Sequence, residues 1–227
     1  MGLIEDAVLA IRAGSPVVLP TDTVYGLCAS PDGAAPVRRL YRLKGRPETQ
    51  ACALLTSGLD LLFERVPELR GRAGRIASEL LPGPYTLILP NPARRYRWLT
   101  GARADAIGVR VPVLEGPARE VLSRVGAVAA TSANLHGGPD PRLPSEIPAE
   151  IRAGCPVVVD GGELPGEPST VIDFTGPEPV IVREGAGSSA ANSIGMSPRQ
   201  TTEPSDDRTN LNGPASWALQ FMRLPAK

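Results

Sequence analysis

The stretch PTDTVYGL, residues 20–27, places two hydroxyls, a carboxylate and a glycine directly after the short apolar run Val17–Leu19. A polar turn at the end of a predicted buried strand is typical of a binding site. Thr and Asp side chains also accept local backbone hydrogen bonds in ordinary turns, so the stretch alone fits a capped loop equally well. The segments that follow it must decide between a site and a loop.

The composition predicts one main domain in a reducing compartment. A hydrophobic fraction of 42% over 227 residues is enough for a sizeable core. The 24 Lys and Arg balance the 24 Asp and Glu, so no net charge attracts nucleic acid or anionic lipid. The cysteines Cys28, Cys52 and Cys155 form no C-x-x-C pair, which favours reduced thiols over a zinc site.

The sequence predicts no contact with a membrane. No apolar run approaches the roughly 20 residues of a membrane-spanning helix. Glu5 and Asp6 stand where a secretory signal would be basic and then apolar. We therefore expect a cytoplasmic protein.

Apolar periodicity predicts an α/β domain over residues 1–187. Helices are expected around residues 4–11, after Asp32 as N-cap, over residues 69–80 and from Pro117. The predicted strands are residues 16–19, 24–29, 51–55, 86–89, 107–111, 128–130, 156–160, 171–174 and 180–182. Residues 188–227 are rich in Ser, Asn, Thr, Pro and Gly, so they predict a disordered tail with a short apolar end segment, Trp217–Leu224.

Cations stand on a predicted bend at Lys44-Gly45-Arg46-Pro47. Gly45 permits a tight backbone and Pro47 blocks helix continuation, so Lys44 and Arg46 are held at a turn. Such a pair suits polyanionic oxygen, because the guanidinium can fork onto phosphate. The preceding cations, Arg38, Arg39 and Arg42, are interpreted as a solvated helix face.

Hydroxyl and cationic residues recur where predicted strands end. They are Thr21, Thr23, Ser132, Ser169, Thr170 and Arg183. In α/β sheets, loops at strand ends build a ligand crevice from segments far apart in sequence. Arg110 interrupts the apolar strand 107–111, so its charge must point outward or meet an anion.

Two further segments carry polar or aromatic side chains. Arg94–Trp98 interleaves arginines with aromatic rings, as nucleic-acid sites do, but the balanced charge favours a rim or lid loop. His136 is the only histidine and has no metal-ligating neighbour in sequence, so we interpret it as an exposed loop residue and not as a catalytic base.

The chemistry that fits these residues is electrostatic. The sequence has no G-x-x-x-x-G-K-[ST] motif, no G-x-G-x-x-G after a strand and no nucleophile elbow. Cations at a polar crevice can accelerate phosphoryl or nucleotidyl transfer by holding the reactants in line. The residues available are Lys44, Arg46 and Arg183 to neutralise phosphates, Ser132, Asn134 and Ser169 to donate to them, and Arg110 to hold a carboxylate.

Eight motifs in order resemble the YrdC-like threonylcarbamoyl-AMP synthases. They are PTDTVYGL (20–27), KGRP (44–47), PGPYT (82–86), GVRVP (108–112), TSAN (131–134), DGG (160–162), PSTV (168–171) and REGA (183–186). The resemblance implies a YrdC/RibB-like three-layer α/β domain with a twisted mixed sheet and a concave cationic cavity. It also implies an enzyme that makes L-threonylcarbamoyladenylate and pyrophosphate from L-threonine, bicarbonate and ATP.

The resemblance assigns roles by position. Thr23, Arg110 and Ser169 would bind threonine, and Lys44 and Arg46 would be catalytic. The ATP side would comprise Lys44, Arg46, Gln50, Ser132, Asn134, Asp140 and Arg183. Magnesium would bridge the phosphates, with ATP oxygens and water as most of its ligands. The product would pass to downstream tRNA threonylcarbamoyltransferase proteins that modify the adenosine beside the anticodon, with any tRNA contact of this chain weak or indirect.

The chain departs from the family pattern at two places. Ala51-Cys52 replaces a common Pro-Leu pair, and Leu55 stands where many relatives carry a histidine that touches threonine. Selectivity for the threonine side chain is therefore open. The alternatives are a carbamoyltransferase of the same fold, of the hydrogenase-maturation type, and a non-catalytic double-stranded RNA or tRNA-binding module.

Overall fold

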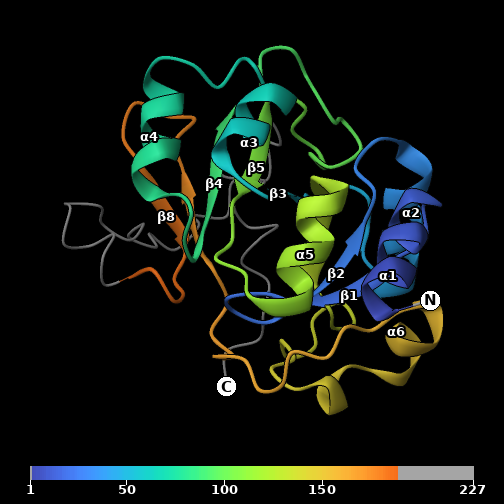
Figure 1. Cartoon of the computed structure of the whole chain (residues 1–227). Helices are drawn as coiled ribbons and strands as arrows, with labels where there is room; N and C mark the ends of the chain where they lie inside the picture. Colours follow the sequence, from blue (N-terminus) through green and yellow to red (C-terminus); the bar gives the residue numbers. More distant parts are fainter. Residues whose placement is uncertain (1, 189–227) are drawn as a thin grey trace, which may run out of the picture.

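The computed structural model describes residues 2–188, which form an eight-stranded sheet with helices on both faces (Figure 1). The strands are β1 (Val17–Pro20), β2 (Tyr25–Ala29), β3 (Ala53–Thr56), β4 (Tyr85–Pro90), β5 (Ala106–Arg110), β6 (Ala127–Ser132), β7 (Thr170–Asp173) and β8 (Val180–Arg183). The helices are α1 (Leu3–Arg12), α2 (Ala34–Lys44), α3 (Leu59–Arg65), α4 (Arg72–Leu80), α5 (Gly116–Val125), α6 (Ala149–Gly154) and the 3₁₀ turn Pro144–Glu146. The predicted tail, residues 188–227, lies outside the described residues except for Ser188.

The sheet is mixed, as predicted. Its strand order is β1-β2-β6-β3-β5-β4-β7-β8. The pairs β3–β5 and β4–β7 are parallel, and the other neighbouring pairs are antiparallel. Strands far apart in sequence are therefore neighbours, and they bring the ends of several loops to one region of the sheet.

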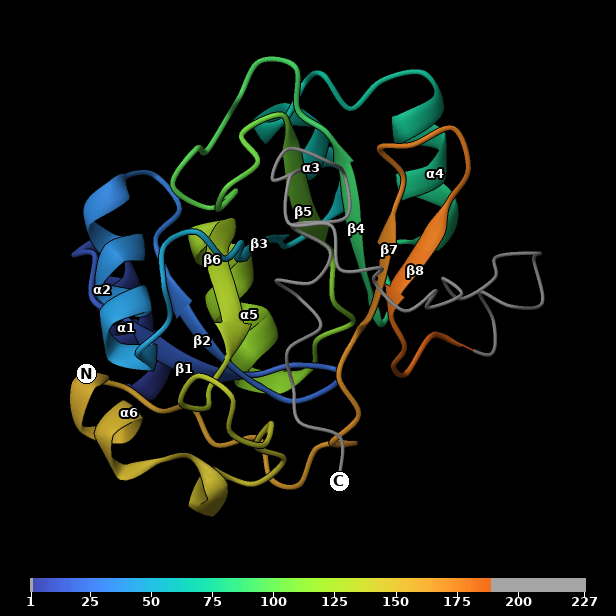
Figure 2. The same cartoon turned by 180° about the vertical axis from the view of Figure 1, so that it is seen from behind.

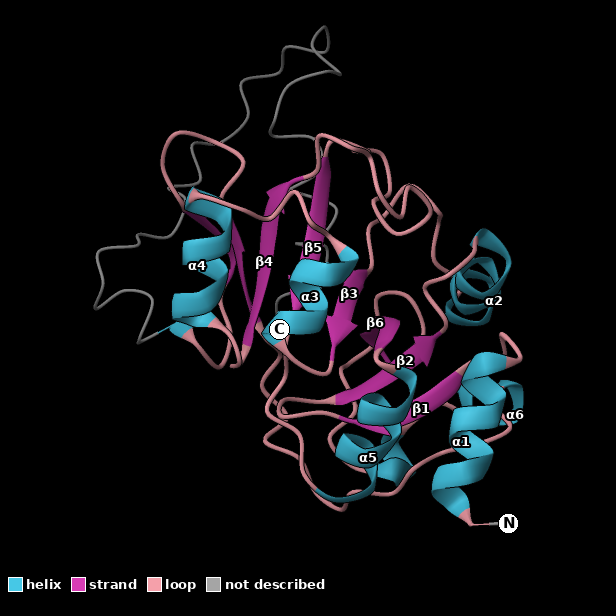
Figure 3. Cartoon of the chain, turned by 45° about the horizontal axis from the view of Figure 1, so that its top comes forward, coloured by secondary structure: helices cyan, strands magenta, loops and turns pink. Residues whose placement is uncertain are grey.

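Alternating side chains divide the core between the two faces of the sheet. On β3, Leu54 packs in the cluster that contains α2, α3 and α4, whereas Leu55 packs in the cluster that contains α1 and α5. Figure 3 shows α3 and α4 beside β3, β4 and β5, with α1 and α5 beside β1 and β2. Two helical layers around one sheet confirm the predicted three-layer class.

Three predicted element boundaries are wrong. The N-cap of α2 is Gly33, and the carboxylate of Asp32 instead pairs with Arg65 from α3. Helix α4 begins at Arg72, after Leu69, because Gly71 at φ 60° breaks the helical path. Residues 156–160 do not form a strand. Only Val158 pairs with β1, at the outer edge of the sheet, where Val18 exchanges backbone hydrogen bonds with Val157 and Val159. The β1–β2 hairpin and the segment that follows α6 can be traced from behind in Figure 2.

Two further predictions concern the cysteines and membrane-spanning helices. The three cysteines of residues 2–188 are buried and free. Within that part of the chain, no helix combines the length and the apolar character that a membrane crossing requires.

Candidate active site

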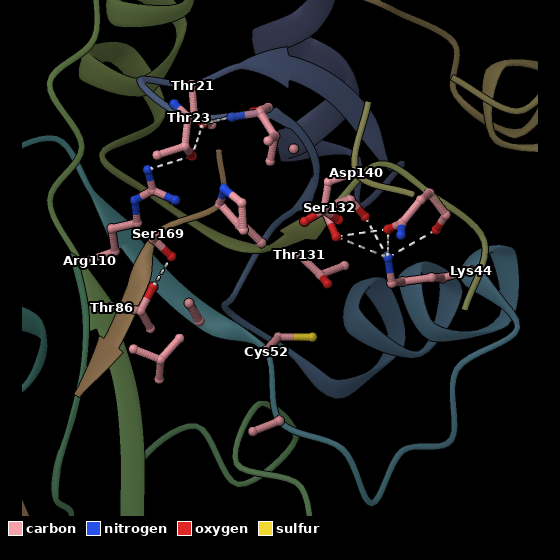
Figure 4. A pocket seen from close by; sticks show the side chains of 18 of the residues that line it. Thr21, Thr23, Lys44, Cys52, Thr86, Arg110, Thr131, Ser132, Asp140 and Ser169 are labelled. Carbon is pink, nitrogen blue, oxygen red and sulfur yellow. Dashed lines mark hydrogen bonds between the residues drawn. The ribbon is translucent and has the colours of Figure 1, made fainter. Parts of the chain in front are cut away.

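One cavity collects every residue that the sequence predicted for binding or catalysis. The ten are Thr23, Lys44, Arg46, Gln50, Arg110, Ser132, Asn134, Asp140, Ser169 and Arg183. They come from the β1–β2 turn, α2 and the bend after it, β5, β6 and the loops around β7 and β8. In Figure 4, Arg110 lies on one side of the cavity and Lys44 on the other. The convergence that the strand-end pattern predicted is therefore present, although the roles of the individual residues stay predictions.

Arg110 reaches the cavity from β5 and is held by the opening stretch of the sequence. Its Nη2 donates to Thr23 Oγ1 at 2.9 Å and forms an ion pair with Asp22. The second carboxylate oxygen of Asp22 accepts the Val113 amide at 3.1 Å. Burial lowers the pKa of Arg110, and the charge of Asp22 opposes that shift.

The Arg110 guanidinium keeps unused donor capacity. Its Nε is buried without a partner among the described residues. An unpartnered buried donor is costly unless a ligand or water accepts from it. Leu55, the register partner of Arg110 on β3, also lines the cavity and gives it an apolar surface. This side of the cavity suits a small molecule with one carboxylate.

Lys44 is the last residue of α2 and does not lie on an exposed bend. Only 4% of its surface is accessible, because the helix end is packed against the loop after β6. Its Nζ donates to the carbonyls of Ser132 at 2.6 Å and Asn134 at 2.9 Å, and to Asn134 Oδ1. Burial and the neighbouring Arg46 lower the pKa of Lys44 to about 7, against the opposing charge of Asp140.

Arg46 stands on the bend that follows α2. Gly45 adopts the left-handed conformation at φ 64° and ends the helix, as the sequence predicted. Arg46 Nη1 donates to Thr131 Oγ1 at 2.9 Å and Nη2 to the Ala51 carbonyl at 2.7 Å, while Nε is buried without a partner in the described chain. The guanidinium is thus fixed in orientation and still able to donate to an anion.

Ser169 connects the two sides of the cavity. Its carbonyl accepts two bonds from Arg183, at 3.2 and 2.8 Å, and its hydroxyl accepts a third at 3.1 Å. The same hydroxyl lies 2.8 Å from Thr86 Oγ1. Burial lowers the pKa of Arg183, with Asp140 acting in the opposite direction. A change at Ser169 would therefore disturb Arg183 as well.

His136 lies closer to the site than the sequence indicated. It is exposed, as expected, but its ring lines the cavity, and its backbone amide donates to the Lys44 carbonyl at 2.8 Å. Burial, then the charges of Arg46 and Lys44, lower its pKa. The imidazole is therefore biased toward its neutral form.

Two hydroxyls of the site were missed. Thr86 and Thr131 line the cavity, on β4 and β6. Thr86 precedes the apolar run Leu87–Leu89 of β4, and Thr131 precedes Ser132 at the end of β6. Threonine is common in strands because of its β propensity, so neither position by itself indicates a site.

Arg94–Trp98 is not a rim or lid loop. These residues do not line the cavity. Arg95 forms a two-bond ion pair with Glu68, at 2.7 and 2.8 Å, and the Trp98 indole donates to the Pro31 carbonyl at 2.8 Å. The segment is tied to the body of the domain instead.

The donor set of the cavity fits a magnesium ion that arrives with phosphates. Among residues 2–188 there is no group of three His, Cys, Asp or Glu side chains placed to hold a metal. Asp140 is the one carboxylate among the residues that line the cavity. Magnesium in nucleotide sites commonly takes one or two carboxylates together with phosphate oxygens and water.

Comparison with known proteins gives consistent relatives. The chain is 34% identical over 176 residues to the threonylcarbamoyl-AMP synthase of Pyrococcus abyssi, covering 77% of this chain and 52% of that protein. It is 35% identical over 149 residues to the enzyme of the same name from Halorhodospira halophila, covering 66% and 75%. The crystal structure of P. abyssi Sua5 complexed with L-threonine superposes with a TM-score of 0.75 at 33% identity, covering 86% of this chain and 58% of that one.

The chain thus spans about half to three quarters of the length of these relatives. The Sua5/YciO/YrdC family, whose description reads "Telomere recombination", matches residues 9–185. That match covers all eight strands and every predicted site residue. The chain belongs to the Sua5/YciO/YrdC family.

Proposed function

We infer that this chain is a threonylcarbamoyl-AMP synthase, a nucleotidyltransferase that joins L-threonine, bicarbonate and ATP into L-threonylcarbamoyladenylate and pyrophosphate. The observation that carries this inference is the division of one cavity into two unlike sides. One side holds a single oriented guanidinium among hydroxyls, and the other gathers Lys44, Arg46 and Arg183. Relatives that share the fold at 34 and 35% identity carry this name.

The threonine side is built around Arg110. Its unpartnered Nε can donate to a carboxylate, and the Thr23 hydroxyl and Asp22 hold the guanidinium plane. Leu55 lines the same cavity, so the amino-acid side chain would pack on an apolar surface. A homologous structure holds L-threonine, which supports this as the substrate.

The ATP side is built around Arg46, Lys44 and Arg183. Arg46 has a buried Nε free to meet a phosphate oxygen. Lys44 and Arg183 are both placed near Asp140, whose charge acts on the pKa of each. Gln50, Ser132 and Asn134 would bind the nucleotide around these cations.

The reaction needs two bond-forming steps. Bicarbonate takes up a proton and loses water to give carbon dioxide; the neutral threonine amine attacks the carbon dioxide and releases a proton, which leaves a carbamate. A carbamate oxygen then attacks the α-phosphorus, and the bond to pyrophosphate breaks with the electron pair leaving on its oxygen. Arg110 orients the amino acid, while Arg46 and Lys44 stabilise the charge that develops on the departing pyrophosphate. Magnesium bound to ATP would neutralise phosphate charge, with Asp140 as the protein carboxylate within its reach.

The product would be consumed by proteins that transfer threonylcarbamoyl to a tRNA adenosine beside the anticodon. The adenylate is a reactive mixed anhydride, so its transfer must follow soon after its synthesis. We propose a cytoplasmic location because the tRNA that receives the threonylcarbamoyl group is found there.

The test is pyrophosphate release by the purified chain. Release should require ATP, L-threonine and bicarbonate together, and it should stop when any one is omitted. Arg46→Ala should lose most activity, whereas Arg42→Ala on the exposed face of α2 should keep it. A wild-type chain that releases no pyrophosphate with all three substrates present would contradict the proposed function.

A further inference from the structure

The segment that carries Arg46 and Gln50, residues 46–52, lies against the connection between β4 and β5, residues 91–105. The Cys52 amide donates to the Leu99 carbonyl at 2.8 Å, and the Ala102 amide donates to the Thr49 carbonyl at 2.9 Å. We propose that Gly101 is a positioning residue for the ATP-side segment, residues 46–52. This inference rests on the proposed function.

Gly101 has no room for a side chain. A Cβ there would lie 2.3 Å from the Thr49 carbonyl oxygen and 2.7 Å from the Ala51 nitrogen. Both neighbours are backbone atoms, so rotation of a side chain cannot relieve the contact. Its φ of 61° also lies in the region that favours glycine. The glycine therefore sets how closely the two segments approach.

The position of Ala51 controls the position of Arg46. The Ala51 carbonyl accepts Arg46 Nη2 at 2.7 Å, one of the two bonds that orient the guanidinium. The next carbonyl back along the chain, that of Gln50, accepts the Tyr41 hydroxyl at 2.6 Å. A displacement of residues 49–51 would move the anchor of Arg46 and the attachment of Gln50 together.

The 91–105 connection is anchored to the core at several points. Asn91 is fully buried, and its amide group donates to the carbonyls of Arg95 at 2.9 Å and Ala104 at 3.0 Å. Leu99 is fully buried in the core, and the Trp98 indole is bonded to Pro31. Thr49, by contrast, is exposed. A steric conflict at Gly101 would therefore be relieved by movement of residues 49–51 toward solvent.

The threonine side is built from other anchors. Arg110 is held by Asp22 and Thr23, and β5 is paired on both sides by β3 and β4. A positioning role for Gly101 therefore predicts a selective defect. ATP binding should weaken while threonine binding is retained.

The experiment compares Gly101→Ala with Gly71→Ala. Gly71 has φ 60°, nearly the same as Gly101, but a Cβ there meets nothing within 4 Å. Gly71→Ala thus places a side chain at a positive φ without the steric conflict. The dissociation constants of ATP and of threonine are measured by calorimetry, independently of turnover. Loss of the oriented contact between Arg46 and a phosphate should raise the ATP Kd at least about tenfold for Gly101→Ala alone, because a hydrogen bond to a charged group contributes roughly that much to affinity.

Hydrogen exchange provides a readout that needs no ligand. The amides of Cys52 and Ala102 bridge the two segments and should exchange faster in Gly101→Ala, with the β-sheet amides unchanged. If Gly101→Ala does not fold, Trp98→Phe is the second variant. It removes the indole bond to Pro31 and shortens the ring that packs against Tyr96, so it loosens the 91–105 connection and should show the same selectivity at smaller amplitude.

Three results would overturn the inference: an unchanged ATP Kd, an equal loss of ATP and threonine binding, or a matching loss in Gly71→Ala. A wild-type chain that binds ATP but releases no pyrophosphate would contradict the proposed function alone. The positioning role would then still be decided by the ATP Kd and the exchange rates.

Discussion

Lys44 is poised between two protonation states. Its ammonium group is buried against the carbonyls of Ser132 and Asn134, and its pKa is lowered to about 7. Unfolded lysine has a pKa near 10.4. A polyanion that arrives beside it would favour the charged form and raise the pKa again. Lys44, which was predicted to neutralise phosphates, is thus a residue whose charge a bound polyanion can restore.

We expect ATP binding to take up a proton through Lys44. At about pH 8, above the pKa of the free enzyme, Lys44 is mostly neutral and must gain a proton when phosphate binds; at about pH 6 it is already charged and gains none. Calorimetry in buffers of different ionisation enthalpy measures this uptake. Proton uptake should therefore be larger at the higher pH.

Lys44→Arg is the matched control for this measurement. Arginine keeps its charge throughout this pH range, so the extra uptake at the higher pH should vanish. Equal uptake in wild type and Lys44→Arg would show that another group, or ATP itself, carries the proton.

Thr23→Val tests the threonine side. Thr23 is fully buried, and its hydroxyl accepts from Arg110 and lies 3.0 Å from the Thr21 hydroxyl. Removal leaves a guanidinium donor without its partner, at a cost of about 1 to 3 kcal/mol. We expect the KM for threonine to rise about tenfold or more, with the KM for ATP little changed. Steady-state kinetics and thermal melting distinguish this from a loss of stability alone.

For single residues, the sequence predicts which side chains line the cavity better than it predicts their burial and contacts. Motif positions name eight of the ten predicted residues that meet in the cavity, whereas Gln50 and Asp140 lie outside the eight motifs. The motifs could not show that Lys44 is buried, because burial depends on how the end of α2 packs against the loop after β6. Nor could they place Thr86, because a threonine in a strand is usually structural.

The strand β3 shows how one element serves two purposes. Leu54 faces the core under α2, α3 and α4, while Leu55, one position later, contributes to the cavity wall. This follows from the two-residue period of a strand. The element therefore combines core packing and cavity lining in adjacent residues.

Leu54→Ala and Leu55→Ala should differ accordingly. Leu54 is fully buried, so its truncation leaves a dry void and should cost about 2 to 5 kcal/mol of unfolding free energy. Space left by Leu55→Ala opens to the cavity, where water can enter, so the loss should be smaller and the KM for threonine should change. Urea denaturation and kinetics measure the two effects. Equal destabilisation with unchanged kinetics in Leu55→Ala would contradict the division.

Element boundaries were less predictable than element types. Periodic apolar residues located the long helices and the strands, but α2 and α4 begin later than predicted, after Gly33 and Gly71. Short elements such as α3 and α6 carry too few turns for a period to emerge. Residues 156–160 have strand composition, yet whether such a run pairs fully or through one bridge depends on its position at the edge of β1.

Acidic and basic residues are equal in number over the whole molecule, but not among the residues that line the cavity. Equal numbers of acidic and basic residues leave no net charge, yet Lys44, Arg46, Arg110 and Arg183 face one space with only Asp140 as a carboxylate. The positive charge is therefore local and enclosed. It suits a small anion better than an extended polyanion, which requires many phosphate contacts on an open surface.

We therefore expect weak binding of double-stranded RNA or tRNA. The exposed cations of α2, Arg38, Arg39 and Arg42, offer few phosphate contacts, and Arg38 is already paired with Glu48. The loop with Arg95 and Trp98, the other segment of nucleic-acid character, is tied to Glu68 and Pro31. Filter binding in a salt series should give little retention at about 150 mM salt. Tight binding that falls steeply with salt, and that is lost when Arg39 and Arg42 are replaced by alanine, would instead establish an RNA surface on α2.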